Sequence, residues 1–226
     1  MLRAYPLMGF HPITMSYKLD DKGAPLILIQ GEWTYHPVFI AQFALVNFNC
    51  YMWYGSEKFK EKFSRCVEWI VNNFVEENGL IKWPYYFDLK LYNIKAPWIS
   101  GMAQGQITSV LLRAYMLTEN EEYLKLADGA VKTMITPIGK GGTLSIDKNG
   151  LWIEEVPSNP PSHILNGFIT ALVGLYEYAL INKEKGDILN KLLQSLKRNI
   201  NFYDLGYWSL YDPVSYTHLR AHETSL

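Results

Sequence analysis

Two short segments of the sequence combine acidic and aromatic side chains in a way that suits proton transfer. They are 152–155, Trp-Ile-Glu-Glu, and 207–212, Tyr-Trp-Ser-Leu-Tyr-Asp. Carboxylates and phenols can exchange protons near neutral pH once burial and neighbouring charges bring their pKa values together. Adjacent side chains of an extended segment point to opposite faces, so only one of Glu154 and Glu155 can face a given cavity. The other is expected to pair with a cation or to face solvent, which is the commoner role for any single acidic residue.

Other side chains could hold a ligand beside such a group. An anionic ligand would need a cation or an amide donor, and a flat apolar ligand face such as that of a sugar ring can stack on an aromatic ring. The candidates are Arg113, Lys95, Gln104, Asn166, Trp152 and Trp208. Lys95 fits better as a solvated loop charge. For Arg113 and the two tryptophans, an ordinary structural role and ligand binding are equally favoured.

Charge and composition exclude several classes of function. A net charge of −1 over 226 residues argues against nucleic-acid binding, which needs a basic face. No apolar run approaches the ~18 residues of a membrane span, and the N-terminus has no secretory h-region, so a soluble chain is expected. Cys50 and Cys66 have no metal-type neighbours, which favours reduced thiols over a disulfide between their helices. Neither a metal nor a cofactor is expected.

The elements that must position these residues repeat along the chain. Gln42, Gln104 and Asn166 recur at an interval of 62 residues, and each lies near the start of an apolar stretch that is followed by an amphipathic one. The apolar stretches are 38–54, 100–117 and 162–180, and the amphipathic ones are 58–77, 118–134 and 185–201. This pattern predicts three helical hairpins. Helices that are apolar all round belong inside and amphipathic ones outside, so the fold class expected is mainly α, an incomplete α/α toroid.

A short aromatic segment follows each hairpin, and a strand is expected before the first. The segments are 79–86, 150–157 and 206–212, and the strand candidate is 26–30. Equivalent places in a toroid lie at the same end, so the three segments should cluster there, with the three amides at equivalent positions on the inner helices.

The end of the chain is expected to have a different origin. Residues 214–224, Val-Ser-Tyr-Thr-His-Leu-Arg-Ala-His-Glu-Thr, look like a translated transposase adaptor from sequencing libraries. We therefore expect residues 214–226 to be an artefact and the natural sequence to stop near Pro213. On that interpretation His218 and His222 are not a metal-binding pair, despite their helical spacing.

Several motifs, in the same order, resemble the C-terminal domain of the D-glucuronyl C5-epimerases (heparosan-N-sulfate-glucuronate 5-epimerases). They are 100–106, Ser-Gly-Met-Ala-Gln-Gly-Gln; 152–157, Trp-Ile-Glu-Glu-Val-Pro; 165–168, Leu-Asn-Gly-Phe; and the closing stretch 203–212. The segment 37–42 is similar to the family's entry into its helical domain. The resemblance covers roughly residues 35–213, and the combination is far more specific than any one motif.

The resemblance implies an activity and a site. This family inverts C5 of glucuronate to iduronate in heparosan- or heparan-like polysaccharides, a step of heparan sulfate biosynthesis in animals, without a cofactor. Its helical domain is an α/α toroid attached to an N-terminal β domain, and the intact protein is a homodimer. The family's catalytic carboxylate corresponds to Glu155 and one active-site tyrosine to Tyr211.

Two positions depart from the family pattern. Val156 stands where the animal enzymes have tyrosine, which suggests a distant, prokaryotic relative whose polymer differs. A terminal Tyr-His-x-x-His segment with another essential tyrosine is replaced by the adaptor-like tail, so a chain that ends here is expected to be inactive.

These observations divide the chain into three parts and leave two other function classes open. Residues 1–34 are expected to be a lead-in, the remnant of a β domain; 35–213 the toroid; and 214–226 the artefactual tail. The alternatives to an epimerase are a polysaccharide lyase or hydrolase on the same toroid, since lyases abstract the same C5 proton, and a non-catalytic domain that binds a uronate polymer.

Overall fold

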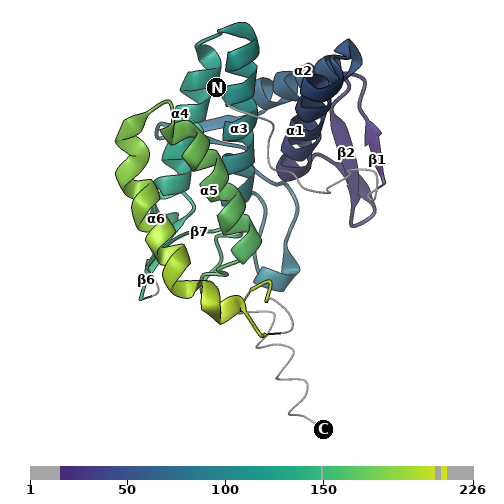
Figure 1. Cartoon of the computed structure of the whole chain (residues 1–226). Helices are drawn as coiled ribbons and strands as arrows, with labels where there is room; N and C mark the ends of the chain where they lie inside the picture. The colour runs from purple at the N-terminus through teal and green to yellow at the C-terminus, as the bar shows by residue number, and fades with distance from the viewer. Residues whose placement is uncertain (1–15, 149, 207–209, 213–226) are drawn as a thin grey trace.

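The computed structural model describes residues 16–148, 150–206 and 210–212, and helices dominate them (Figure 1). The helices pair as three consecutive hairpins: α1 (Pro37–Tyr54) with α2 (Glu57–Asn72), α3 (Gly101–Thr118) with α4 (Glu122–Ile135), and α5 (Leu165–Ala179) with α6 (Gly186–Asn199). Short 3₁₀ turns, η2 (Lys90–Tyr92), η3 (Ile138–Lys140), η4 (Lys183–Lys185) and η5 (Ile200–Tyr203), complete the helical elements.

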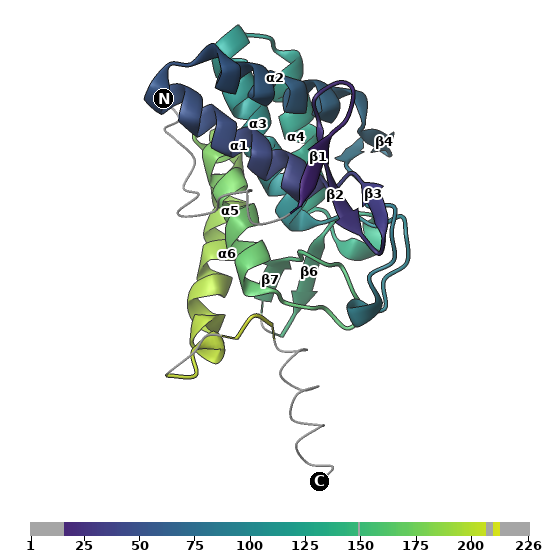
Figure 2. The ribbon, with the colours of Figure 1, turned by 90° about the vertical axis from the view of Figure 1, so that its right-hand side faces the viewer.

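The hairpins form two layers, as the apolar pattern predicts. α1, α3 and α5 pack side by side in that order, and α2, α4 and α6 each cover their own partner from outside (Figures 1 and 2). α3 is in the middle of the inner layer, and its first fourteen residues are all buried because helices surround it. The chain is therefore mainly α, with three hairpins of an incomplete α/α toroid.

Glycines let the backbones of α3 and α5 come close together. A Cβ atom on Gly105 would lie 2.6 Å from the Cα atom of Ala171, and one on Gly174 would lie 2.7 Å from the Cα atom of Gly105. Both distances are shorter than real Cβ atoms tolerate, so the two inner helices can adopt this spacing only without side chains at these positions.

We expect Gly174→Ala to destabilise the chain by about 1–3 kcal/mol, the usual cost of overpacking a rigid contact. The measurement is the free energy of unfolding in urea. Gly186→Ala is the matched control, because Gly186 lies at the start of a helix with a right-handed φ of −61°, and no atom of the described residues lies within 4 Å of the place that the added methyl group would take. Equal stability of the two variants would contradict the close helix contact.

Two β-hairpins follow the outer helices, and a three-stranded sheet precedes the first helix. β4 (Val75–Glu77) pairs with β5 (Leu80–Lys82), and β6 (Leu144–Asp147) pairs with β7 (Gly150–Ile153). The N-terminal sheet has β2 (Pro25–Ile29) between β1 (Tyr17–Leu19) and β3 (Glu32–Thr34), all antiparallel, where the sequence predicted a single strand. It is anchored to α1 by Tyr17, whose ring contacts Phe39 and Phe43.

The described parts of the aromatic segments cluster at one end of the hairpin array, as expected. Each contacts the backbone at the start of an inner helix: Tyr85 Oη with Val38 N, Glu154 O with Gly101 N, and Tyr211 O with Leu165 N. We call this end, where α1, α3 and α5 begin, the front end; it is the lower end of Figures 1 and 2.

The structural repeat differs from the amide repeat. α1, α3 and α5 begin at residues 37, 101 and 165, an interval of 64 rather than 62 residues. Gln42, Gln104 and Asn166 therefore lie two residues closer to the helix start in each successive hairpin. Gln42 and Gln104 are buried, whereas Asn166 is exposed. The predicted equivalence of the three amides is wrong.

Two further sequence expectations have structural counterparts. Cys50 and Cys66 are free thiols, and burial raises the pKa of Cys66. Across the residues described, no helix is both long and apolar enough to cross a membrane.

Candidate active site

Glu155 lies at the front end, on the segment that links β7 to α5. Its side chain packs against Gly167 in the first turn of α5, where a Cβ atom would lie 2.9 Å from the Cδ atom of Glu155 and closer still to its Cβ atom. Only glycine leaves room for the carboxyl group at this point. The glycine of the Leu-Asn-Gly-Phe motif thus lets Glu155 approach a helix N-terminus, whose free N–H groups favour a negative charge.

The carboxyl group of Glu155 is poised to take up or release a proton near neutral pH. Burial raises its pKa, a hydrogen bond from Tyr211 lowers it, and the charge of Asp212 raises it, with a net value of about 7. Tyr211 Oη lies 3.4 Å from Glu155 Oε1, and Oε2 is enclosed with no hydrogen-bond partner among the described residues. A general acid or base works best with its pKa near the working pH, so Glu155 suits that role.

Further polar side chains surround Glu155. Tyr211 is half-exposed, and burial followed by the charge of Glu155 raises its pKa, while a hydrogen bond with the Asn166 side chain lowers it. Asp212 is fully buried and accepts a hydrogen bond of 2.9 Å from Tyr92 Oη. Burial and this carboxylate raise the pKa of Tyr92. The sequence did not single out Tyr92, which η2 brings to the site.

Tyr85 of the first repeat also interacts with the charge of Glu155, and His36 packs against Tyr85. Tyr85 is buried; burial and the charge of Glu155 raise the pKa of its phenol, which accepts a hydrogen bond from Val38 N. The ring of His36 packs edge-on against Tyr85 with centroids 4.9 Å apart. Burial lowers the pKa of His36 to about 4, so the ring is neutral and its Nδ1 accepts from Phe39 N as the N-cap of α1. Sequence reasoning missed Tyr85 and His36 as well.

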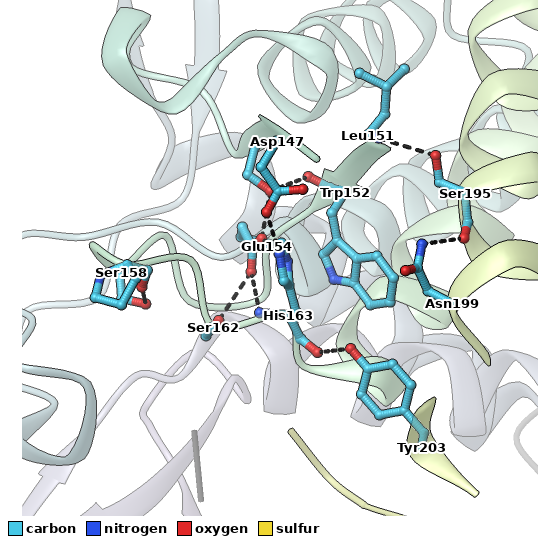
Figure 3. Close-up of polar contacts among 12 residues, drawn as sticks. Asp147, Leu151, Trp152, Glu154, Ser158, Ser162, His163, Ser195, Asn199 and Tyr203 are labelled. Carbon is cyan, nitrogen blue, oxygen red and sulfur yellow. Dashed lines mark hydrogen bonds and ion pairs between the residues drawn. The ribbon is translucent and has the colours of Figure 1, made fainter. Parts of the chain in front are cut away.

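Glu154 points away from Glu155, as the alternation of an extended segment predicts. It is fully buried and accepts hydrogen bonds from Ser145 Oγ, Ser162 Oγ and His163 N at 2.6, 3.0 and 2.8 Å (Figure 3). Its Oε1 also lies 2.7 Å from Nδ1 of His163. Glu154 is therefore the carboxylate that is enclosed by hydrogen bonds and faces the His163 ring, and Glu155 is the one left at the front end.

Comparison with known proteins gives the family. The model of the family described as D-glucuronyl C5-epimerase C-terminus matches residues 77–224. This chain belongs to that family. It is 33% identical over 150 residues to the uncharacterized protein MJ1128 of Methanocaldococcus jannaschii, covering 63% of this chain and 49% of that one. It is 29% identical over 174 residues to the D-glucuronyl C5-epimerase of Caenorhabditis elegans, covering 69% of this chain and 28% of that enzyme.

The chain thus spans half or less of the length of these two relatives. Among solved structures, a family 76 glycoside hydrolase from a bovine Bacteroides thetaiotaomicron strain is similar, with a TM-score of 0.48 and 14% identity, over 79% of this chain and 37% of that one.

Two predicted substrate-binding residues of this epimerase-family domain are structural instead. Arg113 is fully buried in the second half of α3, and its guanidinium group forms two bonds of 2.8 Å with the carboxylate of Glu177. Gln104 is also fully buried; it donates to Ile81 O at 2.6 Å and accepts from Trp83 N at 3.3 Å. The prediction that they bind substrate is wrong, because both groups are enclosed and already bonded.

Trp152 and Trp208 were predicted as rings on which a sugar could stack, and the structure describes only the first of them. Trp152 is 2% exposed and stacks on Phe168 with ring centroids 4.0 Å apart, so it is a core residue. Trp208 lies outside the described residues, as do His218 and His222. Lys95 is the exposed loop charge that was expected and pairs with Asp88 at 2.6 Å. Of the predicted site residues, the structure brings together Glu155, Tyr211 and Asn166.

A groove of about 670 Å³ lies along the loop between β5 and α3, and neither Glu155 nor Tyr211 is among the residues that line it. Pro157, two residues after Glu155, forms part of its wall together with the rings of Tyr86 and Trp98. Lys82 and Lys95 also line it, paired with Glu77 and Asp88. Among the described residues no group of three or more His, Cys, Asp or Glu side chains is placed to hold a metal ion.

Proposed function

We propose that this chain is the catalytic domain of an epimerase that inverts C5 of D-glucuronate residues in a heparosan- or heparan-like polysaccharide to give L-iduronate. The observation that carries the proposal is the enclosed carboxyl group of Glu155, with a pKa of about 7, in contact with the phenol of Tyr211. Membership of the C5-epimerase family supports it.

In the proposed reaction Glu155 acts as the base. Its carboxylate removes the proton from C5, and the electron pair of the C–H bond moves into the substrate carboxylate to give an enediolate. A proton then returns to C5 from the opposite face of the ring, which inverts the centre. A sugar ring cannot fit between oxygen atoms 3.4 Å apart, so Glu155 and Tyr211 serve one face together. Return on the other face requires a second acid beyond this pair.

The substrate carboxylate is proposed to lie at the start of α5. Asn166 is exposed there and offers an amide donor, and the helix dipole favours the charge that grows on the enediolate. Neighbouring sugars of the polymer are proposed to follow the groove past Pro157, where Tyr86 offers an exposed ring.

We expect Tyr211→Phe in the full-length protein to slow C5 exchange by about 10²-fold, the lower range for a proton-transfer group. The phenol relays a proton or stabilises the enediolate, and its loss also raises the pKa of Glu155, because the hydrogen bond that lowers that pKa disappears. Tyr176→Phe, an exposed tyrosine of α5 far from the front end, is the control. Unchanged exchange after Tyr211→Phe would mean that the ring merely packs.

Product analysis separates the epimerase from its alternatives. The full-length protein is incubated with heparosan and its N-sulfated form, and the uronates are identified by NMR. Iduronate supports the proposal. Unsaturated uronate would show a lyase, shorter saturated chains a hydrolase, and binding without turnover a non-catalytic domain; each of these results overturns it.

A further inference from the structure

The segment that carries Glu155 is fastened at both of its ends by one buried carboxylate. Glu154 stands at the beginning of the segment 154–163, and Ser162 and His163 at its end donate to it (Figure 3). Ser145 of β6 donates to the same carboxylate from the side. The hydrogen bonds thus close the segment into a loop and attach it to the β6–β7 hairpin.

The side chain and the backbone of His163 make further contacts that stabilise the loop 154–163. Its ring lies between two carboxylates, with Nδ1 2.7 Å from Glu154 Oε1 and Nε2 2.8 Å from Asp147 Oδ2. Tyr203 Oη donates to the carbonyl oxygen of His163 at 2.6 Å, and the His163 ring packs on Trp152. The backbone of His163 has a φ of 48°, a left-handed conformation that costs free energy for a residue other than glycine.

The charges explain why this arrangement holds. A buried carboxylate such as Glu154 is strongly destabilising unless a cation and hydrogen bonds compensate it. Burial by itself lowers the pKa of His163, but Glu154 and then Asp147 outweigh that effect and raise it. The two carboxylates therefore favour the protonated form of the His163 ring, and Glu154, His163 and Asp147 form a continuous line of close polar contacts, here called the clasp.

We propose that Glu154 and His163 are positioning residues, which keep the adjacent Glu155 enclosed against Gly167 and beside Tyr211. Adjacent residues share a backbone, so an anchored Glu154 side chain fixes the direction in which Glu155 points. The catalytic importance of this enclosure rests on the proposed function, whereas the enclosure itself does not.

The test follows the titration of Glu155 in this chain, with ¹³C-labelled glutamate carboxyls observed by NMR. The resonance is assigned by its loss in Glu155→Gln, and its midpoint is expected near 7. Glu154→Gln should lower the midpoint by at least about one pH unit, a tenfold change in proton affinity, because the released segment lets water reach the carboxylate. The ionisable groups that act on Glu155 or are acted on by it, Tyr211, Asp212, Tyr85 and Tyr92, are unchanged in this variant.

Milder and matched variants keep the test decisive if Glu154→Gln unfolds the chain. Asp147→Asn removes only the outer carboxylate of the clasp, on a partly exposed side chain, and should lower the midpoint in the same direction by less. Glu184→Gln, on an exposed turn between α5 and α6, is the control and should leave the midpoint of Glu155 unchanged. A midpoint that stays near 7 in folded Glu154→Gln or Asp147→Asn overturns the positioning role.

The same variants in the full-length protein connect the clasp to catalysis. Asp147→Asn should lower kcat for C5 exchange and move the acidic limb of its pH profile, with KM for the polymer little changed. A loss of activity without movement of the pH profile would mark a merely structural role. Because the NMR midpoint does not depend on turnover, failure of the epimerase proposal and failure of the positioning proposal give different results.

Discussion

Replacing Glu155 by glutamine should slow C5 proton exchange in the full-length protein by about 10²–10⁴-fold, the usual contribution of a general acid–base group. An amide has nearly the shape of the carboxyl group but cannot accept the C5 proton. Affinity for the polymer should therefore survive, because the contacts of the remaining site residues are unchanged. The measurements are the exchange rate at saturating polymer and the dissociation constant by calorimetry.

Glu154, the adjacent acid, is not a suitable control position, because a substitution there is itself expected to affect Glu155. It is buried in the clasp, so its substitution is expected to act indirectly on Glu155. Glu184→Gln, on an exposed turn between α5 and α6, is the better control and should leave exchange intact. If Glu154→Gln abolished exchange and Glu155→Gln did not, the assignment of the two acids to their faces would be reversed.

The second large effect concerns stability. Glu177→Gln should destabilise the chain by about 3–5 kcal/mol, because it leaves the guanidinium group of Arg113 without its carboxylate inside the protein. Arg113 is 0% exposed and Glu177 only 7% exposed, so water cannot replace the lost partner without a local opening. Urea unfolding of the purified chain measures the change.

A double variant shows whether the loss of stability comes from the guanidinium charge of Arg113 that is left without its carboxylate. Arg113→Met with Glu177→Leu removes both charges and keeps apolar volume between α3 and α5, so it should lose much less stability than Glu177→Gln alone. A loss below about 1 kcal/mol in the single variant would be typical of an exposed pair and would contradict the buried one.

The hairpins and their layers could be predicted from the sequence because hydrophobic periodicity is a local signal. A stretch such as 101–118, apolar nearly all round, has to lie among other helices, and α3 does. The equivalence of the amides could not be predicted this way. The loops before α3 and α5 set where each helix begins, and they shift the structural repeat by two residues relative to the amides.

Polar residues in apolar helices were harder to interpret. Arg113 and Gln104 have the side chains that a ligand site needs, but the same side chains can also bond to buried polar groups of the core. Which role applies depends on partners far along the chain: Glu177 for the arginine, and the backbone of Ile81 for the glutamine. No local pattern reveals those contacts.

Part of the candidate site could be predicted from the sequence. The family resemblance pointed to Glu155 and Tyr211, which the structure places in contact. Tyr92, Tyr85 and His36 were missed because irregular loops and a helix cap bring them in. The bond from Tyr92 to Asp212 joins residues 120 positions apart, and such pairings have no periodic signature.

The central claim is that a proton leaves C5 of a glucuronate residue and returns. The most direct measurement is the incorporation of deuterium at C5 of heparosan-type polymer in heavy water by the full-length protein, read by NMR. We expect deuterium at C5 in both glucuronate and newly formed iduronate, and incorporation that is about 10²–10⁴-fold slower with Glu155→Gln. Iduronate without deuterium, or equal incorporation by the Glu155→Gln variant, would contradict the claim.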